Sequence, residues 1–172
     1  MRRTFLAALL LAASAGAAVP AAAQSQQNLV IQAGAIGQNP VAAAGVRWTL
    51  TPAPGEPRRD PETGMPLPVP ANWSFQLMVT AGAHFGDETD WTVLGTAGLR
   101  APRGSTMIAG IGPVVMVSYR PHAVGPGLRI ETLLNAIGVQ GGALWRLEGP
   151  DDPLFTIQVD ITDAFLRDVF MR

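Results

Sequence analysis

The chain has 172 residues, 48% of them hydrophobic, and its 12 basic and 13 acidic residues give a formal net charge of −1. It contains no cysteine, which excludes disulfide bonds, thiolate metal sites and anchoring through a lipidated cysteine. The slightly acidic balance, without a basic cluster, argues against nucleic-acid binding. Beyond the N-terminal segment no apolar run reaches 18 residues, so membrane-spanning helices are excluded as well.

Residues 1–23 have the features of a secretory signal peptide. Two arginines form a positive start, residues 5–13 form a short apolar run, and Ala21–Ala23 supplies small residues for cleavage before Gln24. The apolar run is too short for a spanning helix. We therefore expect an exported protein whose mature part, residues 24–172, forms one domain with a net charge near −3.

The first two expected strands cover residues 29–37 and 41–51, in which apolar and polar side chains alternate. A strand places successive side chains on opposite faces, so the alternation predicts one apolar and one polar face. The intervening Gln38-Asn39-Pro40 predicts a turn, although one long bent strand over 29–51 with a bulge there stays open. The next segment, 52–70, holds seven prolines and two glycines and is expected to be an extended, solvated loop.

Residues 72–85 carry the clearest alternation in the chain. One face holds Trp73, Phe75, Leu77, Val79, Ala81, Ala83 and Phe85. The length exceeds that of most soluble strands and suits a tilted membrane-spanning strand of about 9–11 residues. A further strand is expected at 91–100, after a turn rich in groups that bind cations. These groups are Asp87, Glu88, Asp90 and His84. Their spacing matches no calcium loop, so we expect a solvated turn.

Two later segments are less regular. Residues 105–120 are apolar on both faces, and Pro113, which cannot donate to a ladder, predicts a bulge or a sheet edge there. Residues 128–140 are compatible with a strand or a helix, and the glycines that follow favour a strand. Two further alternating strands are expected at 143–148 and 154–162.

The C-terminal segment, residues 162–172, has apolar side chains at helical spacing. A short amphipathic helix and a strand that continues to the end both stay open.

The predicted fold class is therefore all-β: an antiparallel up-and-down β-barrel of about eight strands. Aromatic side chains lie on the apolar faces near strand ends, where a membrane barrel carries its interfacial aromatics. These predicted interface residues are Trp48, Trp73, Phe75, Phe85, Trp91, Trp145 and Phe155. Together with the alternation, they make the chain resemble small bacterial outer-membrane β-barrels of the eight-stranded type. The resemblance implies an outer-membrane location and contact with membrane lipid.

Two features depart from that family. An aromatic residue usually closes the final strand, whereas this chain ends in Phe170-Met171-Arg172. The long loops usually follow the odd-numbered strands, whereas the Pro-rich segment here is the second connection.

The polar faces carry charged residues that would meet inside such a barrel. The predicted lumen charge network consists of Arg47, Arg129, Glu131, Arg146, Glu148 and Asp160. Three cations against three anions in a confined space favour a structural network of ion pairs that plugs the lumen. A small gated pore whose selectivity these charges set is the alternative.

No motif indicates catalysis. The chain has two histidines, His84 and His122, and lacks both Gly-x-Ser-x-Gly and His-Glu-x-x-His. We therefore expect no catalytic residues, no metal site and no cofactor. The predicted function is that of a non-enzymatic cell-envelope protein with a structural or minor transport role. The alternative is a soluble periplasmic or secreted β-barrel or sandwich, with its apolar faces turned inward as a core, that binds an apolar ligand or a protein partner.

Overall fold

The computed structural model describes most of the mature chain. The described residues are 24–52, 60, 62–65, 73–87, 89–102, 108–132, 136–149 and 152–163. The expected signal peptide, most of the Pro-rich segment and the question of helix or strand at 164–172 lie outside these residues. In the described part, no helix is long and apolar enough to span a membrane.

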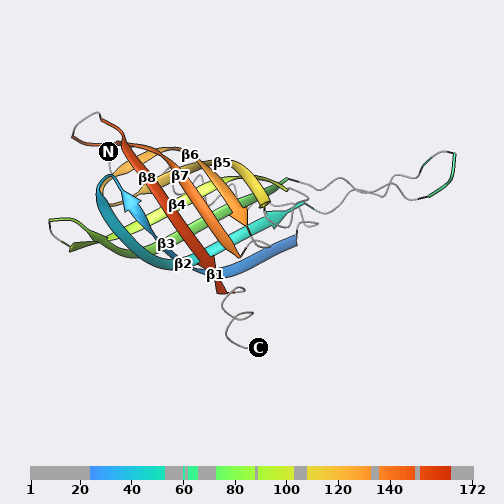
Figure 1. The fold of residues 1–172 in the computed structure, drawn as a ribbon, viewed down its shortest axis with the longest axis horizontal. Coiled ribbons are helices and arrows are strands. Elements are labelled where there is room, and N and C mark those ends of the chain that lie inside the picture. The colour runs from blue at the N-terminus through green and yellow to red at the C-terminus, as the bar shows by residue number, and fades with distance from the viewer. Residues whose placement is uncertain are drawn as a thin grey trace.

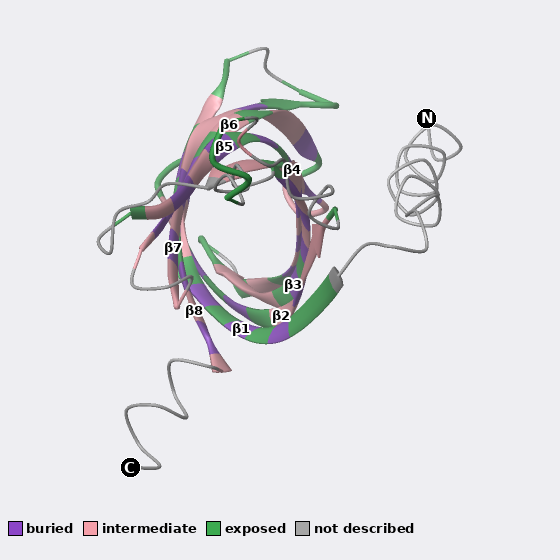
Figure 2. Cartoon of the chain, turned by 90° about the vertical axis from the view of Figure 1, so that its right-hand side faces the viewer, coloured by how far each residue is buried: buried purple, intermediate pink, exposed green. Residues whose placement is uncertain are grey.

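Eight antiparallel strands form one closed barrel, in which each strand pairs with its neighbours in the chain and β8 returns to β1 (Figure 1). The strands are β1 (Gln24–Ile36), β2 (Asn39–Thr51), β3 (Ser74–Phe85), β4 (Thr89–Pro102), β5 (Ile108–Ser118), β6 (Ala123–Thr132), β7 (Ile137–Arg146) and β8 (Leu154–Thr162). Viewed end-on, they form a ring (Figure 2). The predicted all-β, up-and-down barrel of eight strands is confirmed.

The barrel has two ends that differ in what they carry. The start of β1, the end of β8 and the long connection from β2 to β3 lie at one end, which we call the terminal end. The connections that follow β1, β3, β5 and β7 lie at the other, which we call the distal end. The longest connection therefore shares an end with both outermost strand ends.

The pairing register fixes the tilt of the strands. If the paired residues are followed from Val30 around all eight strands, the path returns to β1 ten residues further along that strand, so the stagger (shear number) of the barrel is ten. With strands about 4.8 Å apart and a rise of about 3.3 Å per residue, this stagger corresponds to a tilt of about 40°. An eight-stranded barrel at such a tilt is just wide enough for side chains to fill.

Such a narrow ring needs glycines on its inner face. A Cβ atom added to Gly45 in β2 would overlap the carbonyl oxygen of Val79 in β3. The absence of a side chain therefore lets the neighbouring strand approach closely where the wall curves.

A tight hairpin joins the first two strands. β1 ends at Ile36, β2 starts at Asn39, and Gly37 between them has a φ of 62°, which favours glycine. The alternative of one long bent strand over 29–51 is therefore wrong.

Residues 128–140 belong to two strands and the turn between them. β6 ends at Thr132 and β7 starts at Ile137, and both are extended and paired. The preference for strand over helix was right for both ends of this segment, but a single element over its whole length was wrong. Alternation reports the extended backbone, whereas it does not report a reversal of direction.

Pro113 lies in the middle of β5, with its ring exposed. The pairing of β5 with β4 is present at Val114 and at Ile111 but not at Gly112 or Pro113, and proline has no N–H to donate. The expected bulge lies elsewhere, as a register shift between Ile108 and Gly110 on the β6 side. The sheet-edge alternative is wrong, because the barrel is closed.

The apolar faces of the strands point outward. Leu29 and Ile31 in β1, and Phe155 and Ile157 in β8, are between 57% and 72% exposed. The arrangement in which these faces form a core is not the one that the chain adopts. A smaller apolar cluster lies inside the barrel, toward the distal end. It consists of Ile36, Val41, Leu94, Val114, Met116, Ala123 and Leu144.

Candidate functional site

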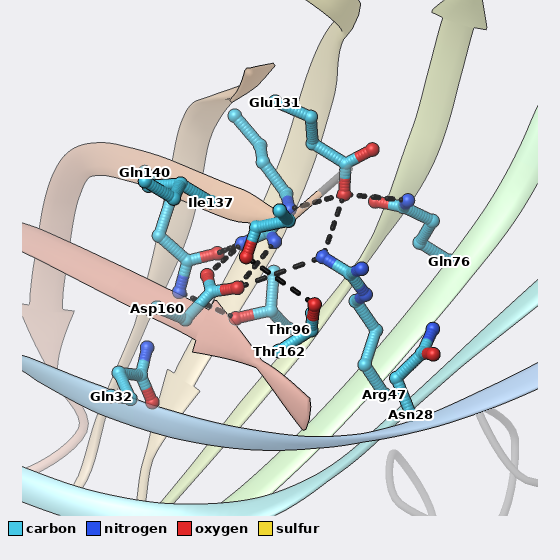
Figure 3. A network of polar contacts seen from close by, with 12 residues as sticks. Asn28, Gln32, Arg47, Gln76, Thr96, Glu131, Ile137, Gln140, Asp160 and Thr162 are labelled. Atoms are coloured by element: carbon cyan, nitrogen blue, oxygen red, sulfur yellow. Dashed lines mark hydrogen bonds and ion pairs between the residues drawn. The ribbon is translucent and has the colours of Figure 1, made fainter. Parts of the chain in front are cut away.

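Five charged side chains from four strands meet inside the barrel, in the half nearer the terminal end. Figure 3 labels three of them, Arg47, Glu131 and Asp160. Arg47 comes from β2, Arg100 from β4, Arg129 and Glu131 from β6, and Asp160 from β8. Their side chains are at most 5% exposed, except that of Arg100 at 15%. Charges this far from water are tolerated only when they are paired, so their mutual contacts decide whether the barrel is stable.

Glu131 lies at the centre of this ionic cluster. Its Oε1 atom accepts hydrogen bonds from Nη1 of Arg47 at 3.0 Å, Nε2 of Gln76 at 2.8 Å and Nε of Arg129 at 3.3 Å. Its Oε2 atom lies 2.7 Å from Nε of Arg100, in an ion pair without the alignment of a hydrogen bond. One carboxylate thus holds β2, β3, β4 and β6 together.

The second carboxylate forms a two-pronged pair with Arg129. Nη1 of Arg129 donates to Oδ1 of Asp160 at 2.5 Å and Nη2 donates to Oδ2 at 2.9 Å, the geometry in which guanidinium and carboxylate groups bind most strongly. Nη1 of Arg47 lies 3.6 Å from Oδ2 of Asp160. Gly138 in β7 leaves the space for this pair, since an added Cβ would overlap both partners.

A chain of amide groups continues from the ionic cluster. Nη1 of Arg129 donates to Oε1 of Gln140 at 3.1 Å, and Nε2 of Gln140 donates to Oε1 of Gln158 at 2.7 Å. Nε2 of Gln32 donates to that same oxygen at 2.6 Å, and the hydroxyl of Thr80 donates to Oε1 of Gln32 at 2.6 Å. The amide chain therefore carries the connection across β7, β8, β1 and β3.

The ionic cluster and the amide chain together bond side chains from seven of the eight strands. Hydroxyl groups complete them: Nε2 of Gln140 also donates to Thr96, and Nε2 of Gln158 donates to Thr156. Beyond them, toward the distal end, lies the apolar cluster. Chemically, this arrangement locks the strands together and fills the lumen with groups that bond to one another.

Four of the six charged residues predicted for the lumen network meet there: Arg47, Arg129, Glu131 and Asp160. Arg146 and Glu148 correct the expectation, because both are exposed, and neither forms an ion pair within the described residues. Arg146 is the last residue of β7, at the distal mouth of the barrel, and Glu148 lies in the turn beyond it. The ionic cluster therefore holds three cations and two anions, whereas three of each were expected.

Arg100 is a member of the ionic cluster that the sequence analysis missed. It shares the inward face of β4 with Thr92 and Thr96, and the alternation that places all three on one face is visible in the sequence. The glutamines of the amide chain were also missed, although each lies on a polar face of its strand.

All seven predicted interface aromatics lie on outward faces or are exposed, in two groups. Near the distal end are Phe85, Trp91, Trp145 and Phe155, and near the terminal end are Trp48, Trp73 and Phe75. Phe75 and Phe85 are ten residues apart in β3. A rise of about 3.3 Å per residue and a tilt of about 40° separate them by about 25 Å along the barrel axis.

In the part of the chain that the structure describes, no three His, Asp or Glu side chains are grouped closely enough to hold a metal ion. In the acidic turn, Glu88 lies outside the described residues and Asp90 is bonded to Arg120. Comparisons with protein-family models, with curated proteins and with solved structures find no match. The geometry of the barrel therefore carries the functional argument.

Proposed function

We propose that this chain is a small outer-membrane β-barrel of a bacterial cell envelope, with a structural role and a closed lumen. The observation that carries the proposal is the distribution of its side chains. The large exposed apolar residues of the strands lie on their outward faces, and most polar and charged residues of the strands face inward. Contact of apolar surface with water costs about 25 cal/mol per Å², whereas lipid chains accept such a surface, and a closed barrel leaves no unpaired edge among them.

The dimensions support the same proposal. The strands contain 9 to 14 residues, and a tilted strand needs about 9–11 to cross a bilayer. The separation of about 25 Å between Phe75 and Phe85 equals the usual height of the apolar band between two aromatic girdles. Both the length of the strands and the placement of the aromatics therefore suit a membrane.

The contents of the lumen favour a structural role over transport. An ion that crosses the barrel has to separate the Arg129–Asp160 pair and the contacts of Glu131, and then pass the apolar cluster. We expect no steady conductance when the purified protein is added to a planar bilayer.

The proposal is tested by locating the mature protein and by its behaviour on gels. We expect it in the outer-membrane fraction, as a band that changes mobility on boiling because the closed barrel survives detergent. A mature protein that is monomeric and soluble without detergent would refute the proposal.

Tryptophan quenching by brominated lipids tests the depth of the barrel. All four tryptophans lie near strand ends, so bromine near the lipid headgroups should quench their fluorescence more than bromine at the chain ends. No quenching by either lipid would contradict membrane insertion.

A further inference from the structure

A cluster of aromatic and charged side chains lies at the distal rim of the barrel, with Trp91 on the outward face of β4. Trp91, at the start of β4, stacks against Tyr119 with ring centroids 5.0 Å apart, and Tyr119 stacks against His122 at 4.8 Å. Arg120 lies over Trp91, with its guanidinium carbon 4.9 Å from the ring centroid. We call Asp90, Trp91, Tyr119, Arg120 and His122 the distal patch.

Within the distal patch, Arg120 is held in one orientation. Its Nη1 atom donates to both carboxylate oxygens of Asp90, at 2.7 and 2.6 Å. The cation–π contact with the Trp91 ring holds the rest of the guanidinium group. An arginine fixed in this way loses little side-chain freedom when it binds a ligand.

The ion pair with Asp90 uses only one corner of the guanidinium. Nε and Nη2 of Arg120 have no hydrogen bond among the described residues, and the side chain is 43% exposed. These two atoms form the fork that binds two oxygens of a phosphate or carboxylate at once. Arg120 therefore offers an oriented site for an oxyanion.

The outward surface of the barrel beyond Trp91 is apolar. Trp91 is followed on the outward face of β4 by Val93 and then by Gly95, where an added Cβ would meet only Val117, at 3.9 Å. The outer surface of the barrel therefore has a shallow depression at Gly95, where no side chain projects. Val115, on the adjacent strand β5, is 52% exposed. A ligand with a phosphate and an apolar tail can bind Arg120 through the phosphate and the apolar surface through the tail. A saccharide without a phosphate can contact only the aromatic rings.

We propose that the distal patch binds the phosphate of a membrane lipid headgroup through Arg120, with an acyl chain lying along Val93 and Gly95. This inference rests on the proposed function, because it places the distal end at the membrane surface. Asp90 acts as a positioning residue that holds Arg120 and does not touch the lipid.

The experiment uses the folded mature protein in phosphate-free neutral micelles and follows its four indole N–H signals by NMR. Three short-chain probes separate the contributions: dihexanoylphosphatidic acid, dihexanoylglycerol and inorganic phosphate. We expect a saturable shift of the Trp91 signal with the phosphatidic acid and a much smaller one with either other probe. Trp145, at the same end, is the internal control.

Variants assign the effect to the fork. Arg120→Gln should weaken binding of the phosphatidic acid about tenfold or more, the worth of a charge-assisted pair. Arg120→Lys keeps the charge but lacks the fork, so its affinity for the phosphatidic acid should lie between that of Arg120→Gln and that of the unchanged protein. Arg146→Gln, which removes another exposed arginine at the distal end, should bind as the unchanged protein does.

Each contrary result has a distinct meaning. An equal response to dihexanoylglycerol, or an unchanged affinity in Arg120→Gln, overturns the phosphate site. An equal response to inorganic phosphate overturns the lipid as its ligand. A sample that changes mobility on boiling but gives no response at Trp91 overturns this inference alone, whereas a missing mobility change overturns the proposed function.

Discussion

Replacement of Glu131 by glutamine tests whether the ionic cluster holds the barrel together. The variant keeps the shape of the side chain, but removes the carboxylate that pairs with the guanidinium groups of Arg47, Arg100 and Arg129. Removal of one partner from a buried ion pair costs about 3–5 kcal/mol. We place Glu131→Gln at about 3 kcal/mol, the low end of this range, because its amide oxygen still accepts the hydrogen bond of Gln76.

The assay is reversible urea unfolding of the protein in lipid vesicles, followed by tryptophan fluorescence. Glu148→Gln is the matched control: this glutamate is exposed, so its free energy of unfolding should change by less than about 0.5 kcal/mol. Adding Arg100→Met to Glu131→Gln should restore about 1–2 kcal/mol, because it removes the cation that the Glu131 carboxylate pairs with in the unchanged protein. A Glu131→Gln protein within about 0.5 kcal/mol of the unchanged protein would refute the reasoning.

Two further substitutions and one pH titration test other features of the structure. Val79→Arg places a charge on the outward face midway along β3 and should cost about 2–4 kcal/mol in vesicles; a loss below about 0.5 kcal/mol would contradict lipid exposure. Gly138→Ala should cost about 1–3 kcal/mol by pushing Arg129 from its carboxylate, and unchanged stability would contradict that overlap. Backbone N–H groups of Thr63 and Glu62 donate to the Asp60 carboxylate and lower its pKa. These hydrogen bonds stabilise the turn fully at a pH above the pKa of an unfolded aspartate. The stabilisation is lost as the pH falls through the lowered pKa of the folded state. An NMR titration of Asp60 with a midpoint at or above the ordinary value would contradict this.

The strands and their faces could be predicted because both follow from local alternation. Residues 72–85 show this most directly: the sequence assigns Val79 to the apolar face and Thr80 to the polar one, and the structure exposes the first and buries the second. In a closed barrel every residue has two strand neighbours, so the period of two is enough to separate outside from inside.

The position of a residue along the barrel axis could not be predicted in the same way. Arg129 and Arg146 both lie on polar faces, yet one pairs with Asp160 and the other is exposed at the distal mouth. The difference depends on the stagger between strands, which accumulates over eight pairings and has no local signal in the sequence. The inner apolar cluster around Leu94 and Leu144 was missed for the same reason.

The single ladder between β8 and β1 has a consequence for how the chain is connected. Every other ladder joins strands that are consecutive in the sequence, so this is the ladder, from Val30–Thr162 to Ile36–Thr156, that joins the first and last strands. Closing the ring is therefore the strand pairing with the largest separation in the sequence, and it should limit the rate of folding. A circular permutant that links Thr162 to Gln24 and opens at the exposed Gly86-Asp87 turn keeps all eight ladders, but makes the β8–β1 ladder local and gives the closing role to the β3–β4 ladder. The order of the strands around the ring is thus independent of the strand with which synthesis begins.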